Sequence, residues 1–410
     1  MSTLRKLTLP SYGDSTGRDL GEAELALLRE AIASGHLTST RGTQVPRLEK
    51  EFAERIGAPH AYACASGSAA VHTAVAAVNP SPGDEVITTS VTDMGAITAI
   101  IYQGAIPVFC DVDPQSYNVT AETIRRKLSP HTKAIIVTHL FGNPCDMDPI
   151  MALARERGIP VIEDCAQAFL ATYKGRQVGT LGDIGCFSFQ QGKHMTTGEG
   201  GIVTTGNADH ARRMFLFINK AWGYGDANAD HYFLAPNYRL SELQGAVAVA
   251  QLHKLDGCVA RRRAAAARMD GLLADLVGAA RPLVTPGGEH VYWKYCLRVD
   301  PQALGADVTA LGAFLKERGV FCAPRYIVKP AFECQVIRDR VTFGTSHWPW
   351  EGSHMAGRAP VTYPPTDYPG TYDALANILV LPWSEFYTDA HVTALAEVIH
   401  EACAHLRKGA

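Results

Sequence analysis

The sequence predicts an α/β protein with a large domain built on a mostly parallel sheet, followed by a smaller α+β domain. Apolar runs alternate with helical patterns through the first part of the chain, and this alternation stops after residue 280. The chain has 410 residues, 47% of them hydrophobic, which is long enough for two cores. We expect the domains to cover residues 1–255 and 256–410.

Two amphipathic helices begin the large domain, and an alternation of strands and helices follows. Apolar residues three and four apart mark helices at 25–32 and 48–56, ended by Gly35 and Gly57. The predicted strands are short apolar runs, at 61–65, 86–87, 105–112, 134–140 and 160–162. Helices begin at 68 and cover 121–128 and 149–157. Apolar strands separated by helices are typical of a parallel sheet covered on both faces.

The second half of the chain begins with a long helix, which we expect to run from Ser241 to 263 and to connect the domains. Beyond it we predict a mixture of short elements, namely a strand at 292–299 and helices at 311–318 and 392–406. The segment 335–375 contains several prolines and no clear period, which predicts an irregular loop.

Composition excludes several classes of function. The net charge is −3 and the basic residues are scattered, so we expect no nucleic-acid partner. The ten cysteines form no CxxC pair, which indicates buried thiols rather than disulfides or a metal site. The sequence shows neither a signal peptide nor an apolar stretch long enough for a bilayer. We therefore predict a cytoplasmic protein with a small-molecule partner.

Three short motifs carry the predicted chemistry. Ser66-Gly67-Ser68 lies between a strand and a helix, where backbone amides and the helix dipole can bind a phosphate; alternatively it is a plain turn. Asp164 follows a buried strand, at the sheet edge where α/β proteins bind ligands; alternatively it caps the next helix. Lys193 lies in a glycine-rich loop five residues after Ser188, and its alternative role is that of a solvated loop lysine.

Together the motifs favour a pyridoxal phosphate (PLP) site. A lysine amine condenses with an aldehyde once its pKa is lowered, and Ser188 is placed to contact the cofactor phosphate. The pyridine nitrogen of PLP must stay protonated for the ring to accept electrons, and a nearby carboxylate such as Asp164 would hold that proton. Gln167 is expected close to the ring.

The motifs resemble the DegT/StrS-type (DegT/DnrJ/StrS) aminotransferases. The resemblance includes residues 163–167, 188–193, 198–201 and 237–239 in order, and extends over nearly the whole chain. It implies a fold type I, dimeric PLP enzyme that transaminates keto sugars and cyclitols. Some relatives have histidine in place of the lysine and act as dehydratases, so Lys193 favours transamination.

The family pattern assigns roles by position. It makes Lys193 the Schiff-base lysine and Asp164 the partner of the ring nitrogen, with Gln167 beside the ring. The phosphate contacts would be Gly67, Ser68 and Ser188, with Asn237 reaching the phosphate of the neighbouring subunit in a shared active site.

Two parts of the site are not specified by the motifs. Family members carry a stacking aromatic where this chain has Ser90 to Gly95, and we expect Asp93 or Met94 there, since Met can lie on a ring. Candidate contacts to the acceptor are aromatic and basic residues in loop-like sequence, each with packing as the alternative: Trp222, Tyr224, Arg325, Tyr326, His347 and Trp350.

The predicted reaction moves an amino group from L-glutamate or L-glutamine to a keto sugar or keto cyclitol. Two alternatives remain open. One is a PLP-dependent sugar dehydratase, which needs no stoichiometric amino donor. The other is a PLP-binding regulatory protein without turnover.

Overall fold

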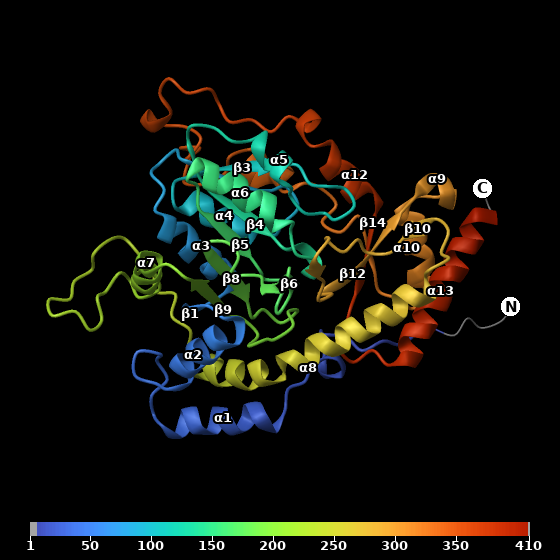
Figure 1. Ribbon diagram of the computed structural model, residues 1–410, viewed down its shortest axis with the longest axis horizontal. Helices are drawn as coiled ribbons and strands as arrows, with labels where there is room; N and C mark the ends of the chain where they lie inside the picture. The colour runs from blue at the N-terminus through green and yellow to red at the C-terminus, as the bar shows by residue number, and fades with distance from the viewer. Residues whose placement is uncertain (1–5, 409–410) are drawn as a thin grey trace.

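A computed structural model describes residues 6–408 and contains a seven-stranded central sheet with helices on both faces (Figure 1). The strand order is β1-β9-β8-β5-β4-β2-β3. β9 is antiparallel to both of its neighbours, and the other adjacent pairs are parallel. The predicted α/β class with a mostly parallel sheet is confirmed. The strands are β1 (His60–Cys64), β2 (Glu85–Thr89), β3 (Ile106–Cys110), β4 (Thr132–Thr138), β5 (Val161–Asp164), β8 (Ile184–Ser188) and β9 (Gly201–Thr205).

The predicted helices of the large domain are present, although α1 and α2 begin three and four residues earlier than expected and α5 ends at Arg125 rather than at 128. Ser66 caps α3 by accepting a hydrogen bond from the Ala69 amide at 3.0 Å. Gly57 ends α2 with a φ of 76°, a left-handed conformation that glycine adopts without steric cost. The helices are α1 (Glu22–Ala33), α2 (Gln44–Ile56), α3 (Gly67–Val78), α4 (Met94–Tyr102), α5 (Ala121–Arg125), α6 (Met147–Arg157) and α7 (Ala208–Ile218).

One helix, α8 (Glu242–Leu272), runs from the large domain into the small domain (Figure 1). It is 31 residues long and continues past residue 263, where we expected it to end. The predicted domain boundary at 255/256 therefore falls inside this helix. Because α2 and α13 (Asp389–Lys408) both pack against it, α8 is the rigid element that connects the two domains.

The small domain is a four-stranded antiparallel sheet packed against α13. The strand order is β10-β12-β14-β13. Its elements are β10 (Ala279–Ala280), β12 (Lys294–Val299), α9 (Pro301–Leu304), α10 (Val308–Glu317), β13 (Ala323–Pro324) and β14 (Ile378–Pro382). A separate three-stranded sheet is formed by β6 (Thr172–Tyr173), β7 (Arg176–Gln177) and β11 (Gly288–Glu289).

The segment 331–377 packs on the large domain, although it lies far along the sequence. Phe332 is buried against Phe109 of β3, with ring centroids 5.7 Å apart. The expectation of an irregular loop up to 375 is wrong at its end, because α12 (Pro369–Asn377) begins with a proline, whose fixed φ suits the first helical position. The other regular elements here are short: η3 (Ala331–Glu333), α11 (Gln335–Arg338), η4 (Ser353–Met355) and η5 (Pro365–Asp367).

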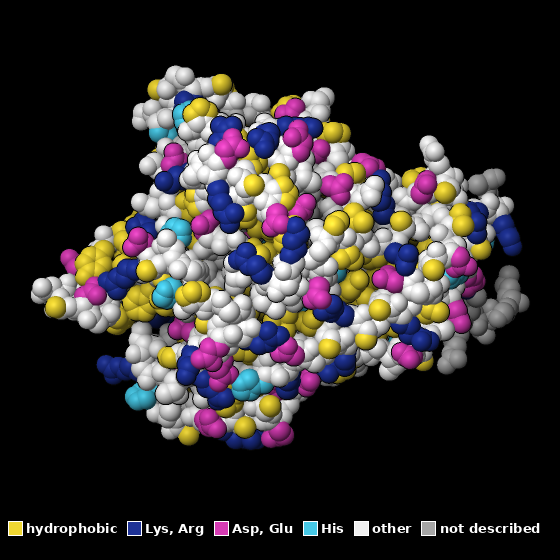
Figure 2. Space-filling view, in the orientation of Figure 1, with side chains coloured by type: hydrophobic (Ala, Val, Ile, Leu, Met, Phe, Trp, Pro, Cys, Tyr) yellow, Lys and Arg dark blue, Asp and Glu magenta, His cyan; other side chains and the backbone are white. Residues whose placement is uncertain are grey.

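The surface carries both signs of charge, and the cysteines are free thiols. Basic and acidic side chains are interspersed over the face shown in Figure 2. All ten cysteines are free thiols, and nine of them are buried. In the part of the chain that the structure describes, no helix is both long enough and apolar enough to cross a membrane.

Candidate active site

The predicted motifs meet at one edge of the central sheet. All strands except β9 run in the same direction, so their carboxyl ends lie at a common edge. Ser66 follows β1, Asp93 follows β2, His139 follows β4, Asp164 ends β5 and Ser188 ends β8. The fold therefore brings together residues that are more than 100 positions apart, at the edge where ligands bind in open α/β sheets.

The amino end of α3 has the properties of a phosphate cradle. A Cβ atom on Gly67 would lie 2.6 Å from the Cβ of Ser188, so only glycine allows these two segments to approach. Within residues 6–408, the first-turn amides of Gly67 and Ser68 have no recorded acceptor. Free amides at the positive end of a helix dipole attract an anion. Ser188 and Ser68 add hydroxyl groups at the same place.

Lys193 is half-buried and carries its ammonium group over an aromatic ring. Its Nζ lies 4.2 Å from the ring centroid of Trp293, which reaches the site from the small domain. The Trp293 indole in turn donates a hydrogen bond to the Gly192 carbonyl at 2.7 Å. Burial lowers the pKa of Lys193, and the negative charges of Asp164 and Asp93 oppose this shift. A lysine with a lowered pKa is a better nucleophile and base at neutral pH.

Asp164 is buried with one oxygen left for a ligand. Its Oδ1 accepts a hydrogen bond from the Ala166 amide at 3.1 Å, and no further hydrogen bond to its side chain is recorded among residues 6–408. Burial raises the pKa of Asp164, which the Ala166 amide and the charge of Lys193 partly offset. A cationic ring nitrogen would stabilise its charged form.

Gln167 is fixed by the backbone of a neighbouring loop. Its Oε1 accepts a hydrogen bond from the Phe141 amide at 2.6 Å. The ring of Tyr326 packs edge-on against Phe141 at 4.9 Å between centroids. Burial raises the pKa of Tyr326, and a hydrogen bond to Gln167 acts in the opposite direction. Among the residues predicted to contact the acceptor substrate, Tyr326 is therefore the one that the fold places in the site.

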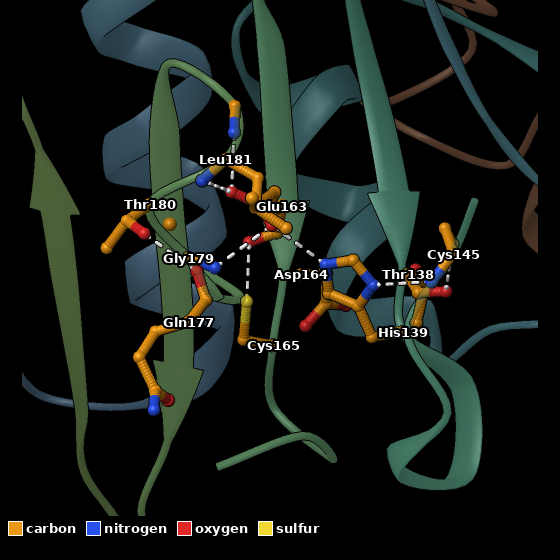
Figure 3. Close-up of polar contacts among 12 residues, drawn as sticks. Thr138, His139, Cys145, Glu163, Asp164, Cys165, Gln177, Gly179, Thr180 and Leu181 are labelled. Atoms are coloured by element: carbon orange, nitrogen blue, oxygen red, sulfur yellow. Dashed lines mark hydrogen bonds and ion pairs between the residues drawn. The ribbon is translucent and has the colours of Figure 1, made fainter. Parts of the chain in front are cut away.

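Beside Asp164, the side chain of Glu163 is the centre of a saturated hydrogen-bond network (Figure 3). Its Oε1 accepts from the amides of Leu181 and Gly182, and its Oε2 accepts from the Gly179 amide at 3.0 Å. Its Oε2 also lies 2.9 Å from Nε2 of His139. His139 Nδ1 accepts from the Cys145 amide, so Nε2 carries the proton and donates it to Glu163.

This network explains a cluster with the composition of a metal site. His139, Glu163 and Cys165 place their ligand atoms within 4.8 Å of one another. Both oxygens of Glu163 and both nitrogens of His139 already have hydrogen-bond partners in the protein. The cluster holds the loops after β4 and β5 in place.

Asp93 and Met94, the two residues expected at the stacking position on the cofactor ring, differ from each other in what they contact. Asp93 caps α4 by accepting from the Gly95 amide at 2.8 Å, and its charge acts on Lys193. Met94 is half-buried and packs against the cluster that includes Ile97 and Phe332. The structure thus associates Asp93, rather than Met94, with the lysine.

The other candidate contacts to the acceptor substrate touch residues other than Lys193. Trp222 packs on His231 at 5.0 Å, and His347 is exposed with its Nδ1 3.2 Å from Glu351. Arg325 is exposed and donates to the Val328 carbonyl at 3.3 Å. Of two more candidates, Tyr224 is exposed, and Trp350 is a core residue that donates to Tyr363. Asn237 is exposed as well, on the segment after α7.

Sequence reasoning missed three residues around Lys193: Arg18, Trp293 and Lys294. Arg18 donates a hydrogen bond to the Lys193 carbonyl at 2.9 Å. Lys294 is a basic residue, yet it is buried in an otherwise largely apolar strand. A charged residue inside such a strand is the signal that could have identified it, whereas Arg18 follows no recognisable motif.

The fold and the site define the class: a fold type I transferase with a lysine of lowered pKa and a buried carboxylate at one sheet edge. Residues 18–356 match the DegT/DnrJ/EryC1/StrS aminotransferase family. The chain belongs to this family, whose aminotransferases depend on PLP.

Named relatives agree with this assignment. The chain is 38% identical over 301 residues to the GDP-perosamine synthase of Caulobacter vibrioides, covering 71% of this chain and 80% of that protein. It is 36% identical over 307 residues to the spore coat polysaccharide biosynthesis protein SpsC of Bacillus subtilis, covering 73% and 78%. The crystal structure of the aminotransferase TlmJ from Streptoalloteichus hindustanus superposes with a TM-score of 0.81 at 30% identity, covering 95% of this chain and 98% of that one.

Proposed function

We propose that this aminotransferase binds PLP through Lys193 and transfers an amino group from L-glutamate or L-glutamine to a keto sugar or keto cyclitol. The observation that carries the proposal is the position of the Lys193 ammonium, which lies over Trp293 in the field of Asp164 and Asp93. A solvated loop lysine would not have the lowered pKa.

The residues present fit the cofactor in both charge and shape. Gly67, Ser68 and Ser188 would hold the phosphate, because the first-turn amides of α3 have no partner within residues 6–408 and Gly67 lets Ser188 lie beside them. Asp164 would hold the proton of the ring nitrogen, and Gln167 would lie beside the ring. When bound, PLP supplies an aldehyde that condenses with amines and a ring that accepts an electron pair.

Lys193 has two roles in this proposal. Its amine would hold the cofactor covalently until an amino donor takes its place. Nζ would then act as the base that removes the proton from the α-carbon of the donor and as the acid that gives this proton back. Trp293 covers Nζ and limits access of water. The same steps in reverse place the amine on the acceptor, which gives ping-pong kinetics.

A sugar acceptor is supported by the names of the relatives. One relative is a GDP-perosamine synthase, and another is a spore coat polysaccharide biosynthesis protein. Tyr326 is the residue we propose to contact the acceptor, because it is the acceptor candidate that packs beside Gln167 and Phe141.

A homodimer with a shared active site is part of the proposal. Exposed apolar side chains gather at the helical face formed by α1 and its preceding turn: Leu20 is 50% exposed, Leu25 43% and Ile32 63%. Leu234, in the segment after α7, is 97% exposed. A second copy would cover these side chains and receive Asn237 at its phosphate. A cytoplasmic location stays a prediction.

A half-reaction assay tests the proposed function. PLP-loaded protein is mixed with L-glutamate, and we expect the yellow colour to bleach while 2-oxoglutarate forms in a 1:1 ratio to active sites. Keto sugars and keto cyclitols are then screened for return of the colour. Release of a deoxy-keto product without consumption of the donor would show a dehydratase, and persistent colour with every donor would favour the regulatory protein.

A further inference from the structure

Next to Lys193 the protein buries two cations that, among residues 6–408, lack acidic partners. Arg18 belongs to the segment before α1, and Lys294 is the first residue of β12. Arg18 is 8% exposed and Lys294 is 7% exposed. Burying a charge without a counter-charge is costly, so such a pair is uncommon in a protein interior.

Neither residue is paired with a carboxylate among residues 6–408. Arg18 donates to the carbonyls of Lys193 and Tyr12, at 2.9 and 3.4 Å, while its Nη2 is buried without any partner. The Lys294 ammonium lies 4.1 Å from the ring centroid of Tyr12 and 4.8 Å from that of Trp293. No hydrogen bond from it is recorded in the described chain.

A third buried cation nearby, Arg262, does have an acidic partner. Arg262 is 1% exposed, pairs with Glu385 at 2.7 Å and donates to the Trp383 carbonyl at 2.7 Å. Glu385 is also the acid whose field reaches Arg18, and it is already paired. The charges acting on Lys294 are those of Arg262, Lys193 and Arg18, together with the Cys296 thiol. Among residues 6–408, Arg18 and Lys294 are thus left without an ion-pair partner.

The unpaired cations lie within reach of the reacting amine. The ammonium groups of Lys193 and Lys294 contact the same indole, that of Trp293, at 4.2 and 4.8 Å from its centroid. Arg18 is bound to the Lys193 carbonyl. A ligand whose amine reaches Lys193 would therefore bring a neighbouring anionic group to these two side chains.

We propose that Arg18 and Lys294 form the subsite that binds a carboxylate of the amino donor. The two donors, a guanidinium and an ammonium, match the charge and hydrogen-bonding capacity of a carboxylate. Their burial favours a compact dicarboxylate such as L-glutamate over the bulkier diphosphate of a nucleotide sugar. This inference rests on the proposed aminotransferase function and identifies how its donor is selected.

The subsite must also tolerate an acceptor that has no carboxylate. Burial and the neighbouring cations lower the pKa of Lys294 to about 7. Near neutral pH, Lys294 can therefore lose its proton when the donor product leaves, which reduces the cost of an empty cationic pocket. A lysine serves this purpose better than a second arginine, which stays charged.

Kinetics of the Lys294→Met variant test the proposal. We expect the KM for L-glutamate to rise about ten- to a hundredfold, since a charge-assisted contact is lost, while the KM for the acceptor stays within twofold. The rate with 1-phenylethylamine, a donor without a carboxylate, should be the same in the variant and the wild type. Lys316→Met, which removes an exposed lysine of α10, is the matched control.

A binding measurement provides a readout independent of turnover. Glutarate should raise the Tm of the wild-type holoenzyme and of Lys316→Met, and should leave that of Lys294→Met unchanged. An Arg18→Gln variant should lose the same response, which keeps the test available if Lys294→Met folds poorly.

The outcomes separate this inference from the function on which it rests. Wild-type protein that fails to react with any amino donor contradicts the proposed function. A wild type that reacts, with an unchanged glutamate KM and glutarate response in Lys294→Met, overturns the subsite alone. A rise in the KM for the acceptor with no change for glutamate would also overturn it and assign the cations to the acceptor's phosphates.

Discussion

Two buried polar regions of this protein differ in how completely their charges are satisfied. Around Glu163, one carboxylate receives three backbone amides and the Nε2 proton of His139. Around Lys294 and Arg18, the contacts of the two cations within the described residues are to aromatic rings and carbonyls. The first region is complete within the chain, whereas the second has charge to offer a ligand.

The comparison shows that burial alone does not identify a functional residue. Glu163 and Asp164 are adjacent on β5, and both are buried. Consecutive strand residues point to opposite faces, so one carboxylate is surrounded by amides while its neighbour points toward the site with an oxygen unpaired. The unsatisfied partner of such a pair is the candidate for chemistry.

The largest effect is expected at the centre of the site. Lys193→Ala should reduce the rate of both half-reactions on the order of 10⁴-fold or more, because the cofactor attachment and the base are lost together. Stopped-flow absorbance with L-glutamate measures this rate, with Lys316→Ala as the control. A variant that completes both half-reactions at the wild-type rate would show that another group transfers the proton.

The next largest effect is expected at Asp164, the carboxylate with an unpaired oxygen. Asp164→Asn keeps the size of the side chain but removes the charge that would hold the ring proton, and we expect a loss of about 10²- to 10³-fold in kcat. The free energy of unfolding should change by less than about 1 kcal/mol, because Oδ1 can still accept from Ala166. A wild-type kcat in this variant would remove Asp164 from the mechanism.

For Glu163, the carboxylate whose hydrogen bonds are satisfied, we predict a large loss of folding stability instead. Glu163→Gln should lower the free energy of unfolding by about 2–4 kcal/mol, since an amide NH₂ would face donors that now bind a carboxylate. Urea denaturation of the variant and of Glu317→Gln, an exposed control on α10, measures the difference. Equal stability of the two variants would mean that the network contributes little.

The buried charge of Lys294 should lower the free energy of unfolding of the enzyme without bound ligand. Lys294→Met is expected to raise the free energy of unfolding by about 1–3 kcal/mol below pH 7, where Lys294 is charged in both states and its burial is unfavourable. The pKa of Lys294 is about 7 in the folded protein and 10.5 ordinarily. Between these values the unfolded chain binds the extra proton, so wild-type stability rises with pH.

The variant lacks this contribution, so its advantage should shrink as the pH rises from 7 toward 10. Urea titrations at several pH values give the comparison. A Lys294→Met protein that is less stable than the wild type at pH 6 would show that Lys294 is satisfied in the folded state, contrary to our account.

The parts of the site that follow strands could be predicted from the sequence. Asp164, Ser188 and Lys193 lie within a few residues of buried apolar runs, and parallel strands bring their carboxyl ends to one edge. Arg18 and Trp293 reach the same place only because α8 fixes the small domain and the N-terminal segment against the loop of Lys193. No local pattern encodes such an arrangement.

The same reason explains what the sequence did not reveal about the segment 331–377. Its prolines correctly indicated irregular backbone, yet Phe332 and Trp350 are core residues packed on α4 and β3. Such packing depends on contacts between positions more than 200 residues apart. His347 and Trp350 looked equivalent as loop residues, and only the fold separates the exposed histidine from the buried tryptophan.

The most direct test of the account is to identify the lysine that carries the cofactor. PLP-loaded protein is reduced with borohydride and digested, and the labelled peptide is sequenced by mass spectrometry. We predict the label on Lys193 and none on Lys294, although both amines lie beside Trp293 and have lowered pKa values. A label on Lys294, or on any other lysine, would contradict the central claim.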